Sequence, residues 1–395
     1  MNAARLHTVL LAPLAHQWRR IPLLDRWLLS ELIGPLLFGI AAFTAVSLSV
    51  GVVFELVRRV AESGLPVWSA MQVLGYRLPG FLVLSFPMAT LMATLLAYSR
   101  LSGGSELTAL RSIGVSTRRM VAPALVLALA MSVLTFIFND LIVPRANLEA
   151  NYTFERGLGR SVTASRGDFI LYPTFGQIAK PDGSNERDLT QLFYARKFEG
   201  GEMKDVTVLD FTRTGQRQML QANRGVWNDT QGMWEFLDGR ITSVDTEGGG
   251  LTTTARFDRY LYPLSSNPIR VATLPTDASV MTVAQARTAE RLLAQAGNQL
   301  EARRMRVRIN EKFAFPAICL VFGLIGSSLG VRPNNRTSRS QGFGISVLLI
   351  FGYYLMSFIF SSLGIKGSLF PVGAAWLPVL IGLTGGLLLL RQASR

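Results

Sequence analysis

Six apolar stretches constrain what this chain can fold into more than any other feature of its sequence. They lie at about 28–54, 78–98, 121–143, 313–331, 342–363 and 371–390. Each stretch is close to the roughly 20 residues that an α-helix needs to cross a bilayer. Charged residues make up only 17% of the chain, whereas soluble domains carry about 25%. The pattern predicts an α-helical integral membrane protein with six transmembrane helices.

Arginine in the short loops predicts how these helices are oriented. The side that carries both ends of the chain collects Arg5, Arg19, Arg20, Arg26, Arg100, Arg111, Arg118, Arg119, Arg332, Arg336, Arg339, Arg391 and Arg395. On the other side, Arg58, Arg59 and Arg77 are offset by Glu55 and Glu62, and Lys366 follows. Because short loops rich in Lys and Arg stay in the cytoplasm, both termini are predicted to be cytoplasmic. These flanks account for the net charge of +14, so nucleic acid is not expected as a partner.

A long polar stretch between the third and fourth apolar stretches sets the domain organisation. We expect a cytoplasmic segment at 1–27, three membrane helices with a cytoplasmic loop helix (102–116) at 28–148, a β domain at 149–275, a connecting helix at 276–312 and three further membrane helices at 313–395. The charge asymmetry places the β domain across the membrane from the termini.

Alternating strand and turn signals fill the predicted β domain. Seven strand-like runs lie at 168–172, 191–197, 205–212, 216–221, 233–236, 241–245 and 251–257. Short strands at this spacing predict an antiparallel sandwich or jelly roll. The run 191–197 is apolar on both faces, which fits either a sheet that lines a groove with one face or an ordinary two-sheet core.

Two local motifs predict helix geometry around the fourth apolar stretch. Thr282 and Gln285 match a capping box at the start of the connecting helix. Gly326 and Gly330 form a GxxxG pair, which we interpret as a close helix contact rather than a ligand site.

The loop at 102–116 predicts a short amphipathic helix. Ser105 is expected to cap it, Glu106 suits its positive end and Gly114 can end it. Leu107 and Leu110 share one face. Two turns of helix are marginal alone, so this helix needs a partner surface, either the membrane or a cytoplasmic motor protein.

The sequence offers little material for chemistry of its own. Cys319 is the only cysteine, and His7 and His16 are the only histidines. The chain has no GxxxxGK[ST] nucleotide loop and no GxSxG or HExxH pattern. No apolar stretch carries a charged residue near its centre, as an ion-coupled pump normally does. We predict no catalytic residue, metal ligand or bound cofactor, and therefore a protein that is not an enzyme.

A set of ordered motifs carries a family resemblance over most of the chain. They are DRWL (25–28), the loop 101–116, NDLIVPRAN (139–147), FYAR (193–196), GVR (330–332) and RSQGF (339–343). In this order, and with three membrane helices on each side of a β domain, the chain resembles the LptF/LptG-type (YjgP/YjgQ) permeases of the lipopolysaccharide-export ABC transporter.

The resemblance implies a multi-pass protein in the inner membrane of a Gram-negative bacterium, with a periplasmic jelly roll. It implies a second permease, either a copy or a paralogue, and a cytoplasmic ABC ATPase dimer that uses ATP and Mg²⁺. Lipopolysaccharide would leave the outer leaflet of the inner membrane and pass through the β domain to a periplasmic bridge. Some family assemblies also contain a single-span protein with a related β domain.

The resemblance also assigns roles to residues. Coupling to the ATPase would involve Ser105, Glu106, Leu107, Leu110, Arg111 and Gly114. Arg58 and Arg59 would meet the lipid head group. The lateral gate and cavity would be lined by Phe43, Ser47, Val50, Phe54, Leu348, Phe351, Tyr354 and Leu355.

Two other functions fit parts of the sequence. An ABC-linked scaffold that transmits force and moves no lipid would share the loop helix and the β domain. A membrane enzyme acting on lipids or peptides would need a group of reactive side chains, and no such constellation has usable spacing.

Overall fold

The computed structural model describes residues 22–158, 168–179, 185–199, 202–212, 216–228, 233–245, 252–262, 277–295, 298–331 and 339–394. These residues divide into two compact units. The helical unit falls within 1–59, 74–147 and 310–395, and the second unit, which contains the β-strands, falls within 60–73 and 148–309.

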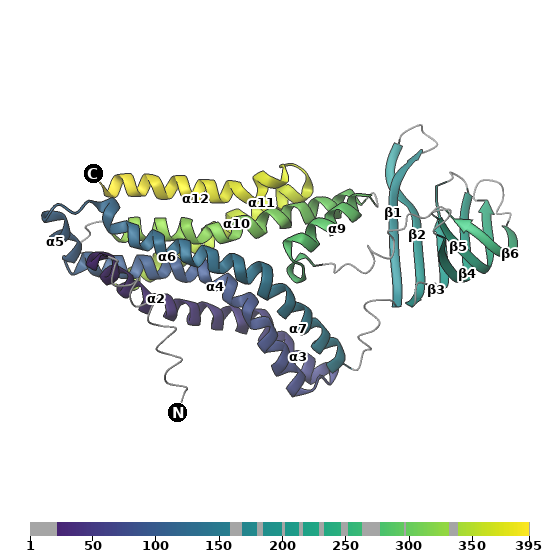
Figure 1. The fold of residues 1–395 in the computed structure, drawn as a ribbon, viewed down its shortest axis with the longest axis horizontal. Helices are drawn as coiled ribbons and strands as arrows, with labels where there is room; N and C mark the ends of the chain where they lie inside the picture. Colours follow the sequence, from purple (N-terminus) through teal and green to yellow (C-terminus); the bar gives the residue numbers. More distant parts are fainter. Residues whose placement is uncertain are drawn as a thin grey trace, which may run out of the picture. The chain divides into compact units, whose positions relative to one another are not determined.

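Six described helices are long and apolar enough to cross a membrane (Figure 1). The first is formed by α2 (Leu23–Leu48), a π-helical turn η1 (Ser49–Val53) and α3 (Phe54–Ser63). The second is α4 (Val67–Gly103), and the third is formed by α6 (Thr117–Ile137), a π-helical turn η2 (Phe138–Ile142) and α7 (Val143–Gly157). The last three are α10 (Gln299–Gly330), α11 (Arg339–Lys366) and α12 (Pro371–Ala393). The predicted number and order of membrane helices are confirmed.

The helices are longer than the apolar stretches that predict them. The first and third have 41 residues each, which corresponds to about 60 Å at the usual rise per residue. A bilayer core is only about 30 Å thick. Both helices therefore continue well beyond the membrane, where polar residues replace the apolar pattern.

Helices α4 and α10 form the centre of the helical unit. In their most apolar windows 67% of the residues are buried, compared with 11% in the first helix and 17% in α11. Glycine explains how α10 approaches its neighbours so closely. A Cβ on Gly326 would overlap Thr94, and one on Gly330 would lie 2.6 Å from Tyr98 Cβ. The GxxxG pair is therefore a contact between α10 and α4, as interpreted from the sequence.

The NDLIVPRAN segment ties the third membrane helix to two neighbours. Lys312 on α10 is buried and donates to the Asn139 carbonyl oxygen in η2 over 3.2 Å. Arg77 on α4 donates to Oδ1 of buried Asn147 over 3.5 Å. The lysine therefore gives a carbonyl oxygen of the π-helical turn a charged hydrogen-bond donor from a neighbouring helix.

The β-strands form one antiparallel sheet in the order β1-β2-β3-β4-β5-β6. They are β1 (Asp168–Ala179), β2 (Asn185–Glu199), β3 (Glu202–Asp210), β4 (Gln216–Asn228), β5 (Met233–Asp245) and β6 (Thr252–Tyr262). The antiparallel prediction is confirmed, but the runs 233–236 and 241–245 belong to a single strand. The described strands have the order of a meander, without the strand crossing that defines a jelly roll.

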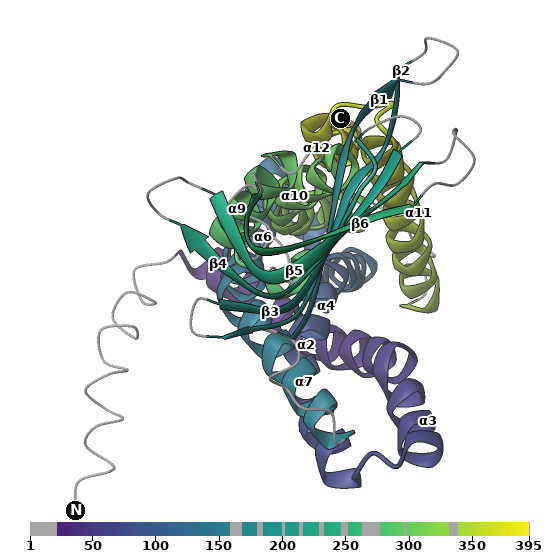
Figure 2. The same ribbon diagram turned by 90° about the vertical axis from the view of Figure 1, so that its right-hand side faces the viewer.

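A strong twist lets this single sheet bury an apolar face (Figure 2). That face forms a cluster of Phe193, Ala195, Met203, Val206, Val208, Leu220, Ala222, Trp234, Phe236 and Tyr262. Non-adjacent strands meet where the β6 residue Tyr262 donates to Asp210 Oδ2 of β3 over 2.7 Å. Gln191 of β2 donates to the same carboxylate over 3.1 Å. The apolar face is thus packed upon itself and, in the described residues, does not line an open groove.

The Asp210 network predicts how stability depends on pH. Burial acts to raise the Asp210 pKa, but hydrogen bonds from Thr212, Tyr262 and Gln191 outweigh it, so this pKa is lowered. The pKa of Tyr262 is raised by burial and by its bond to Asp210. The stabilisation is therefore present between about pH 4 and pH 10, the unfolded-state values, and is lost outside this window.

Asp210→Asn tests this dependence in the full-length protein. We expect thermal unfolding of the β unit in this variant to vary less between pH 3 and pH 5 than in the wild type. A variant with an unchanged acid dependence would show that Asp210 does not carry it. Asp258→Asn is the matched control, because Asp258 is an exposed carboxylate of the same sheet.

The connecting segment confirms the capping box. Thr282 Oγ1 accepts from the backbone N–H of Gln285 over 3.3 Å, and Gln285 Oε1 accepts from the Thr282 N–H over 2.9 Å. Helix α9 (Val283–Gln295) follows. Arg306 on α10 pairs with Glu290 on α9 over 2.7 Å. Helix α10 runs without interruption from Gln299 to Gly330, so only the last part of the predicted connecting helix is continuous with the fourth membrane helix, and α9 is a separate helix.

Candidate functional site

Helix α5 (Glu106–Ser112) is the predicted loop helix, and it lies at the same end of the helical unit as the C-terminus (Figure 1). Leu107 is only 1% exposed and packs with Tyr98, Leu101 and Val331. Arg111 donates to the Val331 carbonyl oxygen over 2.9 Å. These contacts supply the partner surface that a seven-residue helix needs, and they come from the chain itself.

The residues predicted for ATPase coupling therefore divide into two groups. Leu107, Leu110 and Arg111 face the helical unit and position α5. Glu106 is exposed, as is Ile113, whose side chain is 75% exposed. Ile113 follows Leu110 by three residues, a spacing typical of one helix face, but it lies on the outer surface because α5 ends at Ser112.

The two ends of α5 differ in how well they were predicted. Gly114 ends the helix with a φ of +92°, and its N–H donates to the Arg111 carbonyl oxygen over 2.9 Å, as expected. The prediction that Ser105 caps the helix is wrong. Its φ of 60° is left-handed and its side chain makes no capping hydrogen bond, because Gly104 and Ser105 form a tight turn directly after α4. A capping residue normally has an extended backbone.

Ion pairs hold the start of the first membrane helix at the α5 end. Asp25 pairs with Arg119 at the start of α6 over 2.7 Å, and Glu31 pairs with Arg100 near the end of α4. Thr117 donates to the Ala393 carbonyl oxygen over 3.3 Å. The predicted arginine-rich side of the membrane is therefore one connected end of the helical unit.

The predicted head-group residues lie on α3, at the other end of the first membrane helix. Arg58 is exposed, and it makes no ion pair or hydrogen bond within the described ranges. Arg59 lies 3.9 Å from Glu55, one helical turn away. An exposed cation beside a partly neutralised one can attract an anionic group, but nothing in this geometry selects a particular one.

Comparison with known proteins assigns the chain to a family. The sequence model described as lipopolysaccharide export system permease LptF/LptG matches residues 26–392. The chain belongs to this family. Six apolar helices in an LptF/LptG protein imply a multi-pass protein of the inner membrane.

Two curated relatives are more distant. Over 213 residues the chain is 26% identical to the lipopolysaccharide export system permease protein LptG of Haemophilus influenzae. The matched region covers 53% of this chain and 55% of that protein. Over 210 residues it is 24% identical to an uncharacterized protein of Rickettsia prowazekii. That matched region covers 52% of this chain and 54% of the Rickettsia protein. The chain thus spans about half the length of the curated relatives it matches.

The gate residues that the LptF/LptG resemblance predicts on the first membrane helix change character along it. Phe43 and Ser47 are half-buried, and Phe43 packs among the aromatic and aliphatic side chains of α10 and α4. Val50 in η1 and Phe54 in α3 are each 71% exposed. The π-helical turn therefore marks the point where this side of the helix leaves the packed interior.

Three of the four gate residues predicted on α11 lie on one exposed face. They are Leu348, Phe351 and Leu355, spaced three and four residues apart. Tyr354 points inward instead, with its ring 6.5 Å from that of Phe315 on α10. Helices α2 and α11 lie on different sides of the helical unit (Figure 1), but Phe43 and Tyr354 pack against the same buried cluster of α4, α10, α11 and α12. The exposed gate residues of the two helices are not part of that cluster.

Metal-binding geometry is absent from the part of the chain that the structure describes, where no three His, Cys, Asp or Glu side chains are grouped to hold an ion. Cys319 is buried and shares a 3.4 Å hydrogen bond with Thr135. It is therefore a packing residue between α10 and α6.

Proposed function

We propose that this chain is a permease subunit of an ATP-driven lipopolysaccharide exporter. It would extract the glycolipid from the outer leaflet of the inner membrane and pass it through the β unit to a periplasmic bridge. The observation that carries this proposal is the LptF/LptG match over residues 26–392, which spans both sets of membrane helices and the sheet between them.

Helix α5 supports coupling to a cytoplasmic ABC ATPase dimer, which would use ATP and Mg²⁺. Its exposed side presents Glu106 and Ile113, an acidic and an apolar side chain that suit a protein partner. Its inner side holds Val331 at the end of α10 through Arg111. A push on α5 would therefore reach α10, a single helix with residues in both compact units.

The exposed faces of the first membrane helix and α11 support pairing with a second permease, either another copy or a paralogue. Each face is apolar and poorly covered by its own chain. In a two-fold pair, the Val50 and Phe54 face of one subunit would oppose the Phe351 face of the other. Lipid acyl chains would enter between them, with Arg58 and Arg59 near the phosphorylated head group.

The β unit is the element that would receive the lipid in the periplasm, in the place that the family resemblance gives to a jelly roll. Its apolar face is closed around Phe193 and Phe236. Exposing an acyl chain to water costs about 0.8 kcal/mol per methylene. Apolar cover must therefore come from opening of this sheet, or from a neighbouring β domain such as a single-span partner or the bridge.

Purification from native membranes tests the proposal. The full-length protein is isolated in mild detergent, and proteins and lipids are identified together by mass spectrometry. We expect an ABC ATPase, a permease partner and a bound glycolipid. Recovery of the chain without an ATPase in several detergents would contradict the exporter.

Charge reversal on α5 makes the test specific. Glu106→Lys is expected to reduce the recovered ATPase at least tenfold, because a partner surface complementary to Glu106 would be positively charged and would repel the new lysine. Glu62→Lys is the matched control, because Glu62 is exposed at the end of α3. Equal losses in both variants would point to general instability instead.

A force-transmitting scaffold that moves no lipid is the alternative. It shares the anchored α5 and the continuous α10, so ATPase recovery cannot separate the two functions. Photoreactive residues at Val50 and Phe351 can, because only the exporter should give glycolipid adducts there. Adducts absent at both positions, with the ATPase still bound, would favour the scaffold.

A further inference from the structure

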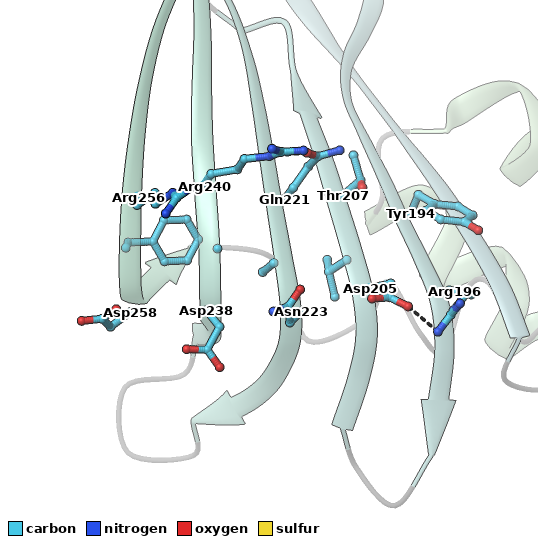
Figure 3. A pocket seen from close by; sticks show the side chains of 14 residues that line it. Tyr194, Arg196, Asp205, Thr207, Gln221, Asn223, Asp238, Arg240, Arg256 and Asp258 are labelled. Carbon is cyan, nitrogen blue, oxygen red and sulfur yellow. Dashed lines mark hydrogen bonds and ion pairs between the residues drawn. The ribbon is translucent and has the colours of Figure 1, made fainter.

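The outer face of the sheet carries a polar groove of about 690 Å³. Two rows of side chains line it across β2 to β6 (Figure 3). The first row is Tyr194, Thr207, Gln221, Arg240 and Arg256, which the strand register places directly opposite one another. The second row lies two residues along each strand and contains Arg196, Asp205, Asn223, Asp238 and Asp258.

The floor of the groove is a narrow strip of backbone between the two rows. The side chains of the residues in this strip point to the other face of the sheet. Ala222 and Gly239 are paired there, and a Cβ on Gly239 would overlap the ring of Phe257. The FYAR run shows the same alternation, since Phe193 enters the apolar core while Tyr194 and Arg196 face the groove. The groove is thus built by the strand register rather than by a loop.

Two arginines occupy directly opposite positions on β5 and β6 in the first row. Arg240 and Arg256 are a cross-strand pair, and like charges at such positions repel. Gln221 accepts from Arg240 Nε over 2.8 Å, which holds that guanidinium in place. Within the described ranges Arg256 has no ion pair or hydrogen bond. A guanidinium group binds phosphate and carboxylate strongly, because it can donate two parallel hydrogen bonds to them.

The second row suits hydroxyl groups. Asp205 is already paired with Arg196 over 2.6 Å, but Asn223 and Asp258 have no hydrogen-bond partner among the described residues. Their oxygens can accept from hydroxyls, and the Tyr194 ring adds an apolar surface on which a sugar ring can pack. A groove volume between 300 and 1,000 Å³ is typical of small-ligand sites.

The backbone is strained at this groove. Three described non-glycine residues have a positive φ, and two of them, Asp205 at 49° and Asp238 at 52°, line it. Such conformations cost free energy and concentrate at functional sites. Here the positive φ values change the direction in which two side chains of the second row, those of Asp205 and Asp238, leave their strands.

We propose that this groove binds an acidic sugar, that is, a saccharide carrying a phosphate or carboxylate group. Arg240 and Arg256 hold the anionic group, while Asn223 and Asp258 accept from the hydroxyls. If the ligand is the head group of the exported lipid, the assignment rests on the proposed function. A soluble acidic glycan would use the same contacts.

Calorimetry on the full-length protein in detergent tests this site with probes that have no acyl chains. The probes are a deacylated phosphorylated lipopolysaccharide oligosaccharide, an oligogalacturonate, neutral maltotetraose and inorganic phosphate. Saturable binding of either acidic saccharide, at least tenfold tighter than maltotetraose and phosphate, supports the proposal. Equal binding of inorganic phosphate, or no saturable binding of the acidic saccharides, overturns it.

Substitutions then locate the site. Arg256→Gln is expected to weaken binding about tenfold or more, the loss of one charge-assisted contact, and Arg256→Lys to weaken it less. Arg217→Gln removes the same charge from an exposed position of β4 outside the groove and should change nothing. Equal losses for Arg256→Gln and Arg217→Gln would show only general attraction to a basic sheet.

The outcome is independent of the exporter. The probes need neither the ATPase nor lipid extraction, so failed saccharide binding leaves the exporter standing. The protein could instead bind the saccharides while its purification recovers no ATPase or glycolipid. That result would contradict the proposed exporter and support the saccharide site in the groove. The affinities for the phosphorylated oligosaccharide and for oligogalacturonate are then compared. This comparison distinguishes a lipopolysaccharide head group from another acidic glycan as the ligand.

Discussion

Gly326→Val is expected to prevent stable packing of α10 against α4. The new side chain would enter space filled by Thr94, and its Cβ would lie 2.9 Å from the Leu91 carbonyl oxygen. A flexible side chain could move aside, but the backbone of α4 cannot do so without separating the two central helices. Overpacking a tight interior costs about 1–3 kcal/mol, and more when no rotamer relieves it.

Thermal unfolding of the detergent-purified protein measures this loss. Gly385→Val is the matched control, because a Cβ on Gly385 in α12 would have no neighbouring atom within 4 Å. We expect a large drop in the unfolding midpoint or in folded yield for Gly326→Val, and a small change for Gly385→Val. Similar midpoints in both variants would show that α10 does not depend on close contact with α4.

Arg111→Gln is expected to loosen α5 without removing its outward surface. The substitution shortens the side chain that bonds the Val331 carbonyl oxygen. A hydrogen bond from a charged group contributes about 1.5–3 kcal/mol, so the docked position of α5 should lose tenfold or more in population. In the proposed exporter, lipid released per ATP hydrolysed should fall about tenfold while ATPase binding is largely kept, because Glu106 and Ile113 are unchanged.

Hydrogen exchange tests the same substitution without assuming the function. Amides of α5 should exchange faster in Arg111→Gln, while those of α4 and α6 stay protected. Arg118→Gln is the control, because Arg118 is an exposed arginine at the start of α6. Unchanged α5 exchange in Arg111→Gln would mean that Leu107 alone holds the helix.

Hydrophobicity explains why the membrane helices were predictable and their ends were not. The apolar run 28–54 marks the part of the first helix that avoids water. Hydrophobicity is the strongest signal of a membrane helix in a sequence. The structure extends that helix from Leu23 to Ser63. Beyond the apolar part the helix is sustained by its own backbone bonds and by packing, which leave a weaker trace in the sequence.

Strand number shows a similar limit in the β unit. Asp238 and Gly239 look like a turn between 233–236 and 241–245, because both residue types favour turns. In the structure they lie within β5, where Asp238 adopts a φ of 52° and Gly239 makes room for the ring of Phe257. Packing against Phe257 of the neighbouring strand therefore keeps Asp238 and Gly239 within β5, although their local propensity favours a turn.

The sequence by itself determined six membrane helices, the antiparallel sheet between them, the capping box at Thr282 and the family, because each follows from a periodic or local pattern. Only the tertiary structure decided that Leu107 and Arg111 face inward, that Tyr354 turns away from the predicted gate, and that Arg240 meets Arg256 across two strands. Those outcomes depend on which distant residues become neighbours, and no local pattern carries that information.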